Sequence, residues 1–324
     1  SAGISTMTGG GRRSARRTRA NAAARPMPGK PLRIVVTGRE GQVARALAER
    51  CADQEEIRLV HAERPDFDMA DPERLADKIA ALAPDIVVNA AAYTAVDQAE
   101  SEPDLAMAIN ATAAGEVARG ARLAGAPVVH ISTDYVFDGS LGRPYRETDP
   151  VSPLGVYGRT KLAGEKAVAA ANPRHLVMRT SWVYSPFGRN FVKTMLRLAE
   201  TRDEIGVVAD QVGNPTSAFV IADGALAAIR SGRLQQPERP GGIYHLSGTG
   251  SASWYEVAQA VFERHSAAGK RVPLVKAITT AEYPTPARRP ADSRLDTALA
   301  EKTFGYRAPD WRVSLAETMR ALER

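Results

Sequence analysis

The chain has 324 residues, of which 44% are hydrophobic and 25% charged, a composition typical of a soluble globular protein with one large α/β domain or two joined ones. No apolar run approaches the ~18 residues that a membrane span needs, and a single cysteine, Cys51, excludes an intrachain disulfide and fits a reducing cytoplasm. The net charge of +6 arises in residues 1–30, which carry seven basic and no acidic side chains. The remainder is close to neutral, so the body of the protein is not expected to bind nucleic acid or membranes.

Residues 1–30 are rich in Gly, Ser, Ala and Arg and offer almost nothing to bury. Such a composition predicts a disordered basic tail. It could be a remnant of cloning, a mis-assigned start or a genuine basic arm. The stretch lacks the continuous apolar core of a secretion signal, which favours a cytoplasmic location.

From residue 31 onward, short β-rich runs alternate with helical stretches. Strands are expected at 32–37, 57–61, 85–90, 127–132 and 175–180. Helices are expected at 41–50, at 71–82 with Asp71 as N-cap and Pro72 in the first turn, at 98–124 with Gly125 near its end, and around Tyr157 and Lys161. Apolar strands that alternate with helices predict an α/β fold of the doubly wound Rossmann type, with a parallel sheet covered on both faces.

After residue 181 the pattern becomes irregular. Helices are expected near 189–202, 217–231, 253–266 and 313–323, with short strands near 205–208 and 243–246. We therefore predict a dinucleotide-binding domain and a smaller mixed α/β substrate-binding lobe. The first comprises residues 31–181 with a returning segment near 217–232, and the second comprises 182–216 and 233–324.

A glycine-rich turn follows the first strand in VVTGREGQVARAL. Gly38, Gly41 and Ala44 have the G-x-x-G-x-x-A spacing, and the turn leads directly into a helix. Glycine lets the backbone turn tightly and lets a pyrophosphate approach the free N–H groups of the helix N-terminus. In this strand-turn-helix context the pattern predicts a dinucleotide site.

The segment after the second strand, HAERPDFDMAD, bears on the choice of coenzyme. Glu63 could hold a ribose 2′-hydroxyl, whereas Arg64 could hold a 2′-phosphate. These two residues leave NADH and NADPH open. Asp68 and Met69 are placed to meet the adenine.

The ends of the third and fourth strands carry small and hydroxyl side chains. NAAAYTAVD (89–97) is rich in alanine, which would allow either close approach of a ligand or close helix packing. Ser132 and Thr133 end the fourth strand, where the sheet edge would face the coenzyme.

Tyr157 and Lys161 lie four residues apart on one helix, so both side chains emerge on the same face. A phenol ordinarily titrates near pH ~10, and a neighbouring ammonium should lower that pKa. The pair is therefore a candidate for proton transfer. Thr133, at the end of the strand that comes before this helix, would add a hydroxyl group.

This order of signals resembles the short-chain dehydrogenase/reductase superfamily. Within it, the sequence is similar to the dTDP-4-dehydrorhamnose reductase family over about residues 32–320. The glycine turn is GxxGQVA rather than the GxxGxxG usual for the large sugar-nucleotide epimerases. The likeness rests on the blocks GQV, NAAAYTAVDQAE, STDYVFDG, SPLGVYGRTKLAGE, RTSWVYSPFGRNFVKTML, DQVGNPT, YHLSG and YPTPARRPADSRLD.

The resemblance implies a role for each matching residue. Catalysis would rest on Tyr157 as proton donor, Lys161 as its partner and ribose ligand, and Thr133 as the hydroxyl that orients the carbonyl. Coenzyme contacts besides Tyr157 and Lys161 would come from Gly38, Gly41, Gln42, Val43, Asp68, Met69, Ala92, Tyr93 and Thr94. Substrate contacts would come from Thr133, Asp134, Trp182, Asn190, Gln211 and Arg288.

The implied activity is that of an oxidoreductase acting on a CH–OH group in carbohydrate biosynthesis. It would reduce the C4 ketone of dTDP-4-dehydro-L-rhamnose to dTDP-L-rhamnose with NADPH or NADH. Some family members bridge a homodimer through magnesium, so the resemblance allows a homodimer and Mg²⁺. No metal site is predicted, because the carboxylates cannot be placed.

Three other functions remain open at this point. The chain could be a non-catalytic dinucleotide-binding regulatory subunit that resembles the methionine adenosyltransferase β subunit, although retention of Thr133, Tyr157 and Lys161 argues against it. An epimerase or dehydratase is disfavoured because Asp134-Tyr135 replaces the Asp-Glu pair of dehydratases. The basic tail could bind nucleic acid. His130, His175 and His245 lack metal-ligand spacing and are expected to pack within strands.

Overall fold

A six-stranded parallel sheet forms the centre of the fold, with strand order β10-β5-β4-β3-β1-β2. The computed structural model describes residues 30–236 and 241–323. The expectations for residues 1–29 lie outside this range. The strands are β1 (Leu32–Thr37), β2 (Ile57–Ala62), β3 (Ile86–Asn89), β4 (Val128–Thr133), β5 (His175–Thr180) and β10 (Gly242–His245).

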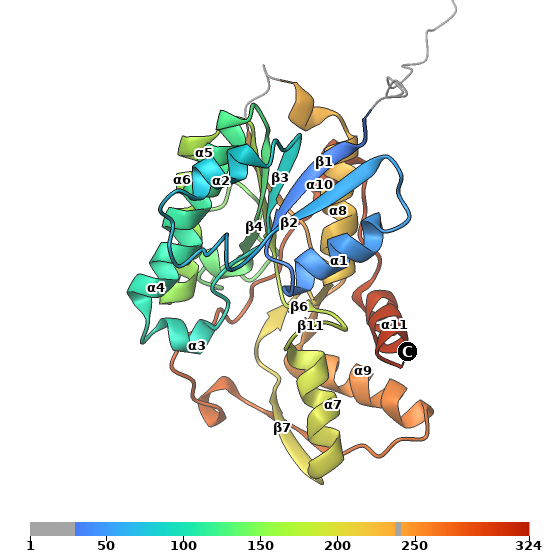
Figure 1. The fold of residues 1–324 in the computed structure, drawn as a ribbon. Helices are drawn as coiled ribbons and strands as arrows, with labels where there is room; N and C mark the ends of the chain where they lie inside the picture. The colour runs from blue at the N-terminus through green and yellow to red at the C-terminus, as the bar shows by residue number, and fades with distance from the viewer. Residues whose placement is uncertain (1–29, 237–240, 324) are drawn as a thin grey trace, which may run out of the picture. The chain divides into compact units, whose positions relative to one another are not determined.

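Helices cover both faces of this sheet (Figure 1). One face carries α1 (Gln42–Cys51), α8 (Ala218–Arg230) and α10 (Ala298–Phe304), and the other carries α2 (Leu75–Ala81), α5 (Ala114–Leu123) and α6 (Val156–Ala171). Alternate residues of β1 face the two sides, because Val36 packs with the first group and Val35 with the second. This two-sided burial confirms the predicted doubly wound α/β fold and explains why consecutive residues at the centres of the strands are apolar.

The helix expected at 71–82 begins later than predicted. Residues before Leu75 form turns, and Arg74 has a left-handed φ of 63°, so the helical conformation cannot extend back through it. The N-cap assigned to Asp71 is therefore wrong.

The long helix expected at 98–124 is divided into four pieces. These are α3 (Val96–Ala99), α4 (Pro103–Met107), a π-helical turn η1 (Ala108–Ala113) and α5. Pro103 occupies the first turn of α4, where its missing N–H is tolerated, and so marks a new start. Gly125 follows α5 with a φ of 73°, as expected for a glycine that ends a helix.

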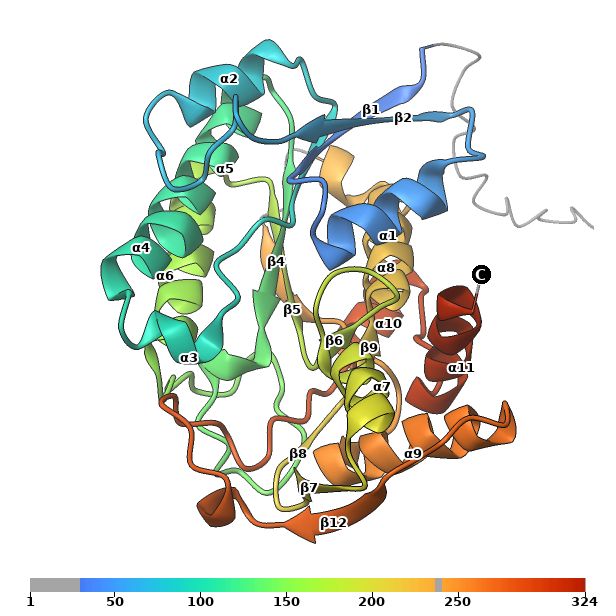
Figure 2. The ribbon, with the colours of Figure 1, turned by 60° about the horizontal axis from the view of Figure 1, so that its bottom comes forward.

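A second apolar cluster lies among the remaining elements, which Figure 2 shows grouped beyond the flanking helices. These elements are α7 (Phe191–Thr201), β7 (Glu204–Val208), α9 (Trp254–Ala267), β12 (Leu274–Ile278) and α11 (Trp311–Leu322). Short segments complete the fold: η2 (Asp134–Val136), β6 (Val183–Tyr184), β8 (Val212–Gly213), β9 (Thr216–Ser217), η3 (Arg233–Gln235), β11 (Ala252–Ser253) and η4 (Thr280–Glu282). Sequence reasoning missed β12, which pairs in parallel with β7.

The strand expected near 243–246 was assigned to the smaller lobe, and the structure corrects its place. β10 pairs in parallel with β5 and so belongs to the main sheet, which α10 also covers. A four-residue strand carries too little pattern to reveal which sheet it joins. The division into two functional domains otherwise stays a prediction.

Cys51 is buried in the main core, where it packs among apolar side chains. The three strand histidines are also packed as expected: His130 contacts Asn89, His175 contacts Asn172 and His245 contacts Tyr145 through hydrogen bonds. Between residues 30 and 323, leaving aside 237–240, no helix has the length and apolar character for a membrane crossing.

Candidate active site

The glycine turn has the geometry that a phosphate-binding turn requires. Gly38 has a φ of 80°, a left-handed conformation that side chains disfavour, and its N–H donates to the Ala62 carbonyl at 2.7 Å. A β-carbon added at Gly41 would meet nothing within 4 Å. In the described chain, no side chain caps the start of α1 and no acid lies in its first turn. The first N–H groups of α1 are therefore suited to receive an anion.

The two residues that open α1 use their side chains internally. The Gln42 Oε1 accepts hydrogen bonds from Ser185 Oγ at 2.7 Å and from Asn190 Nδ2 at 3.1 Å. Val43 packs its side chain into the main core. The Val43 side chain and the Gln42 side-chain oxygen are therefore engaged within the protein, and the backbone N–H groups of the turn are the groups best placed to meet a coenzyme.

Asn190 caps α7 and holds the preceding loop. Its Oδ1 accepts from the Lys193 N–H at 3.2 Å, and its Nδ2 donates to the carbonyls of Ser185 and Phe187 at 2.8 and 3.1 Å. Its amide is therefore engaged within the protein, which favours a positioning role over the expected substrate contact.

Near the end of β2, an arginine that was not expected there is a further candidate for contact with the coenzyme. Arg39, inside the glycine turn, donates to Glu63 Oε1 at 3.0 Å, whereas Arg64 is exposed. Asp68 Oδ1 accepts from the Ala70 N–H at 2.9 Å, and Met69 packs at the edge of a core cluster. The sequence GREG contained this signal, since a basic residue there faces the end of the neighbouring strand.

The loop after β3 is shaped by a buried hydroxyl. Thr37 Oγ1 accepts from the N–H groups of Ala90 and Ala91 at 3.0 and 2.9 Å and donates to Asn89 Oδ1 at 2.8 Å. These bonds fix the path of the backbone just before Ala92. The alanine-rich run therefore follows the sheet edge closely.

Two further predicted coenzyme contacts follow in that loop. The Tyr93 N–H donates to Asn110 Oδ1 at 2.8 Å, and its hydroxyl donates to Glu102 Oε2 at 2.6 Å. That carboxylate raises the pKa of Tyr93 to about 12. Thr94 is exposed.

The structure brings Thr133, Tyr157 and Lys161 together beside the carboxyl end of β4. The Thr133 hydroxyl contacts the Tyr157 phenol and donates to Asp134 Oδ1 at 3.0 Å. Lys161 Nζ donates to the Ile131 carbonyl, also on β4, at 2.7 Å. A β-carbon at Gly158 would lie 2.2 Å from the Tyr135 carbonyl, so glycine is required for α6 to approach this closely.

The structure contradicts the expectation that Lys161 lowers the pKa of Tyr157. Burial raises the pKa of Tyr157 to about 12, the Asp134 charge adds to this effect, and contact with Thr133 opposes it. Burial also lowers the pKa of Lys161 to about 8, while Glu165 opposes this shift. The phenol thus keeps its proton, as a general acid must, and the ammonium is directed at a backbone carbonyl.

Asp134 is a buried carboxyl group next to this cluster. Burial raises its pKa to about 7, although the hydroxyls of Ser293 and Thr133 oppose the shift. Asp134 therefore titrates close to neutral pH, which its position in the sequence did not reveal.

The remaining predicted substrate residues come from the second group of elements. Trp182 stacks on Trp254 with ring centroids 3.6 Å apart and an angle of 3° between planes. Gln211 Nε2 donates to Thr280 Oγ1 at 3.0 Å. Arg288 is exposed.

The residue after Arg288 was missed and is better anchored. Arg289 forms an ion pair with Asp97 of α3 at 2.8 Å and lies near Tyr135. Because it joins a late loop to the β3–α3 region, only the folded structure could reveal it. Within residues 30–236 and 241–323, no three His, Cys, Asp or Glu side chains gather as a metal site.

Comparison with known proteins agrees with this geometry. Residues 32–324 match the family model described as RmlD substrate binding domain. A dTDP-4-dehydrorhamnose reductase of Sinorhizobium fredii is 49% identical over 291 residues, which are 90% of this chain and 98% of that protein.

Two solved dTDP-4-dehydrorhamnose reductases have the same fold, and each alignment covers 90% of this chain and all of the other. The Clostridium acetobutylicum protein has a TM-score of 0.83 at 38% identity. The Bacillus anthracis protein, solved with NADP, has a TM-score of 0.82 at 35% identity. The chain therefore belongs to the RmlD family of dTDP-4-dehydrorhamnose reductases.

Proposed function

We propose that this chain reduces the C4 ketone of dTDP-4-dehydro-L-rhamnose to dTDP-L-rhamnose with a nicotinamide coenzyme. The observation that carries the proposal is the meeting of Thr133, Tyr157 and Lys161 beside the end of β4. The family membership supplies the substrate class.

The structure has suitable groups for a dinucleotide. The left-handed Gly38 and the uncapped start of α1 would hold the pyrophosphate, and Ala92, Tyr93 and Thr94 border the same edge of the sheet. We propose that Asp68 and Met69 meet the adenosine. When bound, the coenzyme supplies the hydride that reduces C4.

The protein's own groups handle the proton and the orientation. Tyr157 donates its phenolic proton to the C4 oxygen as negative charge develops there, which is general-acid catalysis. Thr133 orients the carbonyl from the strand end. Lys161 supplies a positive charge from the same helix, α6, one turn after Tyr157, and its Nζ is anchored at the Ile131 carbonyl of β4.

The coenzyme can be either NADPH or NADH in this proposal. Arg39 provides a cation for a 2′-phosphate, and Glu63, its ion-pair partner, provides an acceptor for a 2′-hydroxyl. The Bacillus anthracis relative was solved with NADP. We place Asp134, Trp182, Gln211 and Arg288 on the substrate side.

Location and assembly follow from the family expectations. We propose a cytoplasmic enzyme and allow a homodimer. Magnesium rests on resemblance alone, because the described residues gather no carboxylate cluster, and the proposed reaction does not require it.

The test is an assay of dTDP-4-dehydrorhamnose reduction with NADH and NADPH side by side, followed by the loss of nicotinamide absorbance. The proposal predicts turnover that yields dTDP-L-rhamnose with at least one coenzyme. Coenzyme binding without turnover, together with capture of a synthetase subunit, would instead support the regulatory-subunit interpretation.

A further inference from the structure

We infer that the buried ion pair of Glu165 and Arg179 positions the catalytic groups, by tying the helix that carries Tyr157 and Lys161 to the strand end that carries Thr133. The inference rests on the proposed reductase function and deepens it. Neither Glu165 nor Arg179 touches the reacting atoms in this account. Both act through their neighbours.

The pair is bidentate and almost fully enclosed. Arg179 Nη2 donates to Glu165 Oε2 at 2.7 Å, and Arg179 Nε donates to Oε1 at 2.9 Å. Their side chains are 2% and 4% exposed. Two parallel hydrogen bonds between planar groups fix orientation as well as distance.

This pair connects three elements of the catalytic region. Glu165 lies one turn after Lys161 on α6, and Arg179 lies on β5. Ser132, which pairs with Arg179 across the sheet and directly precedes Thr133, donates its hydroxyl to Glu165 Oε1 at 2.6 Å. One carboxylate therefore ties the helix of Lys161 to the strand of Thr133.

Stability alone does not account for this arrangement. Burying two charges costs a large amount of solvation free energy. A protein in which apolar residues of similar volume replace a buried ion pair is therefore often as stable or more stable. Within the described chain, Arg179 Nη1 also lacks a hydrogen-bond partner although it is buried. The ion pair of Glu165 and Arg179 is therefore better explained by its effect on the position and charge of the adjacent residues.

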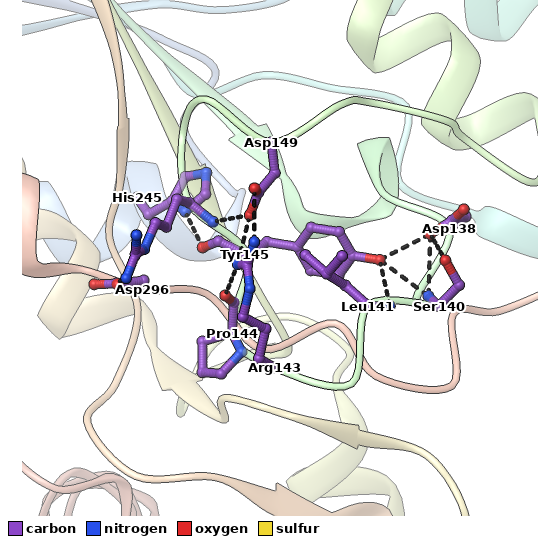
Figure 3. A network of polar contacts seen from close by, with 10 residues as sticks. Asp138, Ser140, Leu141, Arg143, Pro144, Tyr145, Asp149, His245 and Asp296 are labelled. Carbon is purple, nitrogen blue, oxygen red and sulfur yellow. Dashed lines mark hydrogen bonds and ion pairs between the residues drawn. The ribbon is translucent and has the colours of Figure 1, made fainter.

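The outer side of Arg179 is held by a rigid loop. Its guanidinium lies over the Phe137 ring at 5.1 Å, and that ring stacks on Tyr145 at 4.1 Å. Figure 3 shows how Tyr145 is fixed: its hydroxyl donates to Asp138 at 2.8 Å, and its carbonyl contacts His245 Nδ1 at 3.0 Å. These contacts cover the side of Arg179 that faces away from Glu165.

The charges around Lys161 determine how it titrates. Burial lowers the pKa of Lys161 to about 8, and Glu165 is the charge that opposes this shift. From β4, His130 remains neutral because burial and Lys161 hold its pKa well below its ordinary value. Arg179 faces the same carboxylate from β5, and the phenol of Tyr157 is protonated. Asp134 in η2, with a pKa of about 7, lies on the far side, beside Thr133.

Removal of the Glu165 charge should change this balance in a measurable way. Glu165→Gln keeps the volume and an acceptor for Ser132, but it leaves Arg179 and Lys161 as two buried cations. Lys161 should then lose its proton at lower pH. We expect the alkaline limb of the kcat/KM profile to move down by about one pH unit or more, while activity near pH 6 falls less than tenfold.

Three variants separate charge from structure. Glu165→Gln/Arg179→Met also lacks the charge that opposes the shift of Lys161, but it leaves no unpaired arginine, so its limb should lie between those of wild type and Glu165→Gln. Glu165→Asp keeps the charge with shorter reach, so its limb should stay in place while kcat falls. Glu116→Gln, which breaks an exposed ion pair with Arg119 on α5, should change nothing.

The outcomes are distinguishable from failure of the proposed function, which would show as absence of turnover in the wild-type chain. Binding of NADPH, followed by fluorescence as a function of pH, gives a second readout that needs no turnover. A Glu165→Gln profile that superimposes on wild type after scaling would overturn the inference. If that single variant does not fold, a shifted limb in Glu165→Asp, or a limb of the double variant that superimposes on wild type, would overturn it equally.

Discussion

The Tyr135 ring meets the Tyr157 ring edge-on, with centroids 5.5 Å apart and planes at 77°. Arg289 faces Tyr135 and pairs with Asp97 of α3. A loop near the C-terminal end of the sequence therefore reaches the residue that supports the catalytic phenol. This contact links the proposed substrate side to the proposed proton donor.

Breaking this link should weaken substrate binding selectively. Arg289→Gln removes the ion pair with Asp97, in which the Asp97 side chain is 41% exposed, so its free energy is at most about 1 kcal/mol. We expect KM for the sugar nucleotide to rise about fivefold, with KM for the coenzyme unchanged. Steady-state kinetics with Arg119→Gln as control checks this, and an equal rise in both KM values would contradict it.

The glycine turn can be tested with a matched pair of glycines. Gly38→Ala and Gly125→Ala both place a side chain at a left-handed φ, 80° and 73°, so each should lower the free energy of unfolding by about 1 to 2 kcal/mol. Only Gly38 borders the proposed pyrophosphate site. Calorimetry should show weaker coenzyme binding for Gly38→Ala alone, and equal affinities for both variants would remove the turn from the site.

Arg39 should decide how strongly the 2′-phosphate is bound. Loss of a charge-assisted hydrogen bond worth about 1.5 to 3 kcal/mol predicts that Arg39→Ala raises KM for NADPH roughly tenfold or more. KM for NADH should change little, since it carries no 2′-phosphate. Parallel titration of both coenzymes measures the ratio, and an unchanged ratio would place the 2′-position elsewhere.

Asp134 gives the protein a pH-dependent stability. Its pKa, raised from an ordinary 3.8 to about 7, means that the folded chain binds this proton more tightly than the unfolded chain. The contribution of Asp134 to stability is therefore fully present below pH 3.8 and is lost as the pH rises from there to about 7. Asp134→Asn should flatten this part of the curve in urea unfolding at pH 5, 6, 7 and 8. A variant curve parallel to wild type would show that Asp134 does not titrate there.

Much of the fold could be predicted because its signals are local. β1, β2 and β5 are six-residue strands whose central residues are apolar, and the glycine turn follows β1 directly. The pair Tyr157 and Lys161 also needs only helical spacing. Local sequence patterns do not show which sheet a short strand joins. β10 is an example, because its place in the main sheet depends on its pairing with β5.

The parts of the site that were missed depend on distant partners. Arg289 is held in position by its ion pair with Asp97. Glu165 can be recognised as a positioning residue only from its hydrogen bonds with Arg179 and Ser132. The pKa of Tyr157 was predicted in the wrong direction, because sequence spacing shows the nearby lysine but not the burial of the phenol. Desolvation is a property of the folded environment.

In the proposed reaction, Tyr157 donates its phenolic proton to the substrate. Tyr157→Phe removes that proton and keeps the aromatic ring. The decisive measurement is the rate of coenzyme oxidation in stopped flow, at saturating dTDP-4-dehydrorhamnose and with coenzyme affinity measured alongside. For Tyr157→Phe we expect a rate of coenzyme oxidation at least ~10²-fold below wild type, with coenzyme affinity unchanged. A rate close to wild type would contradict it.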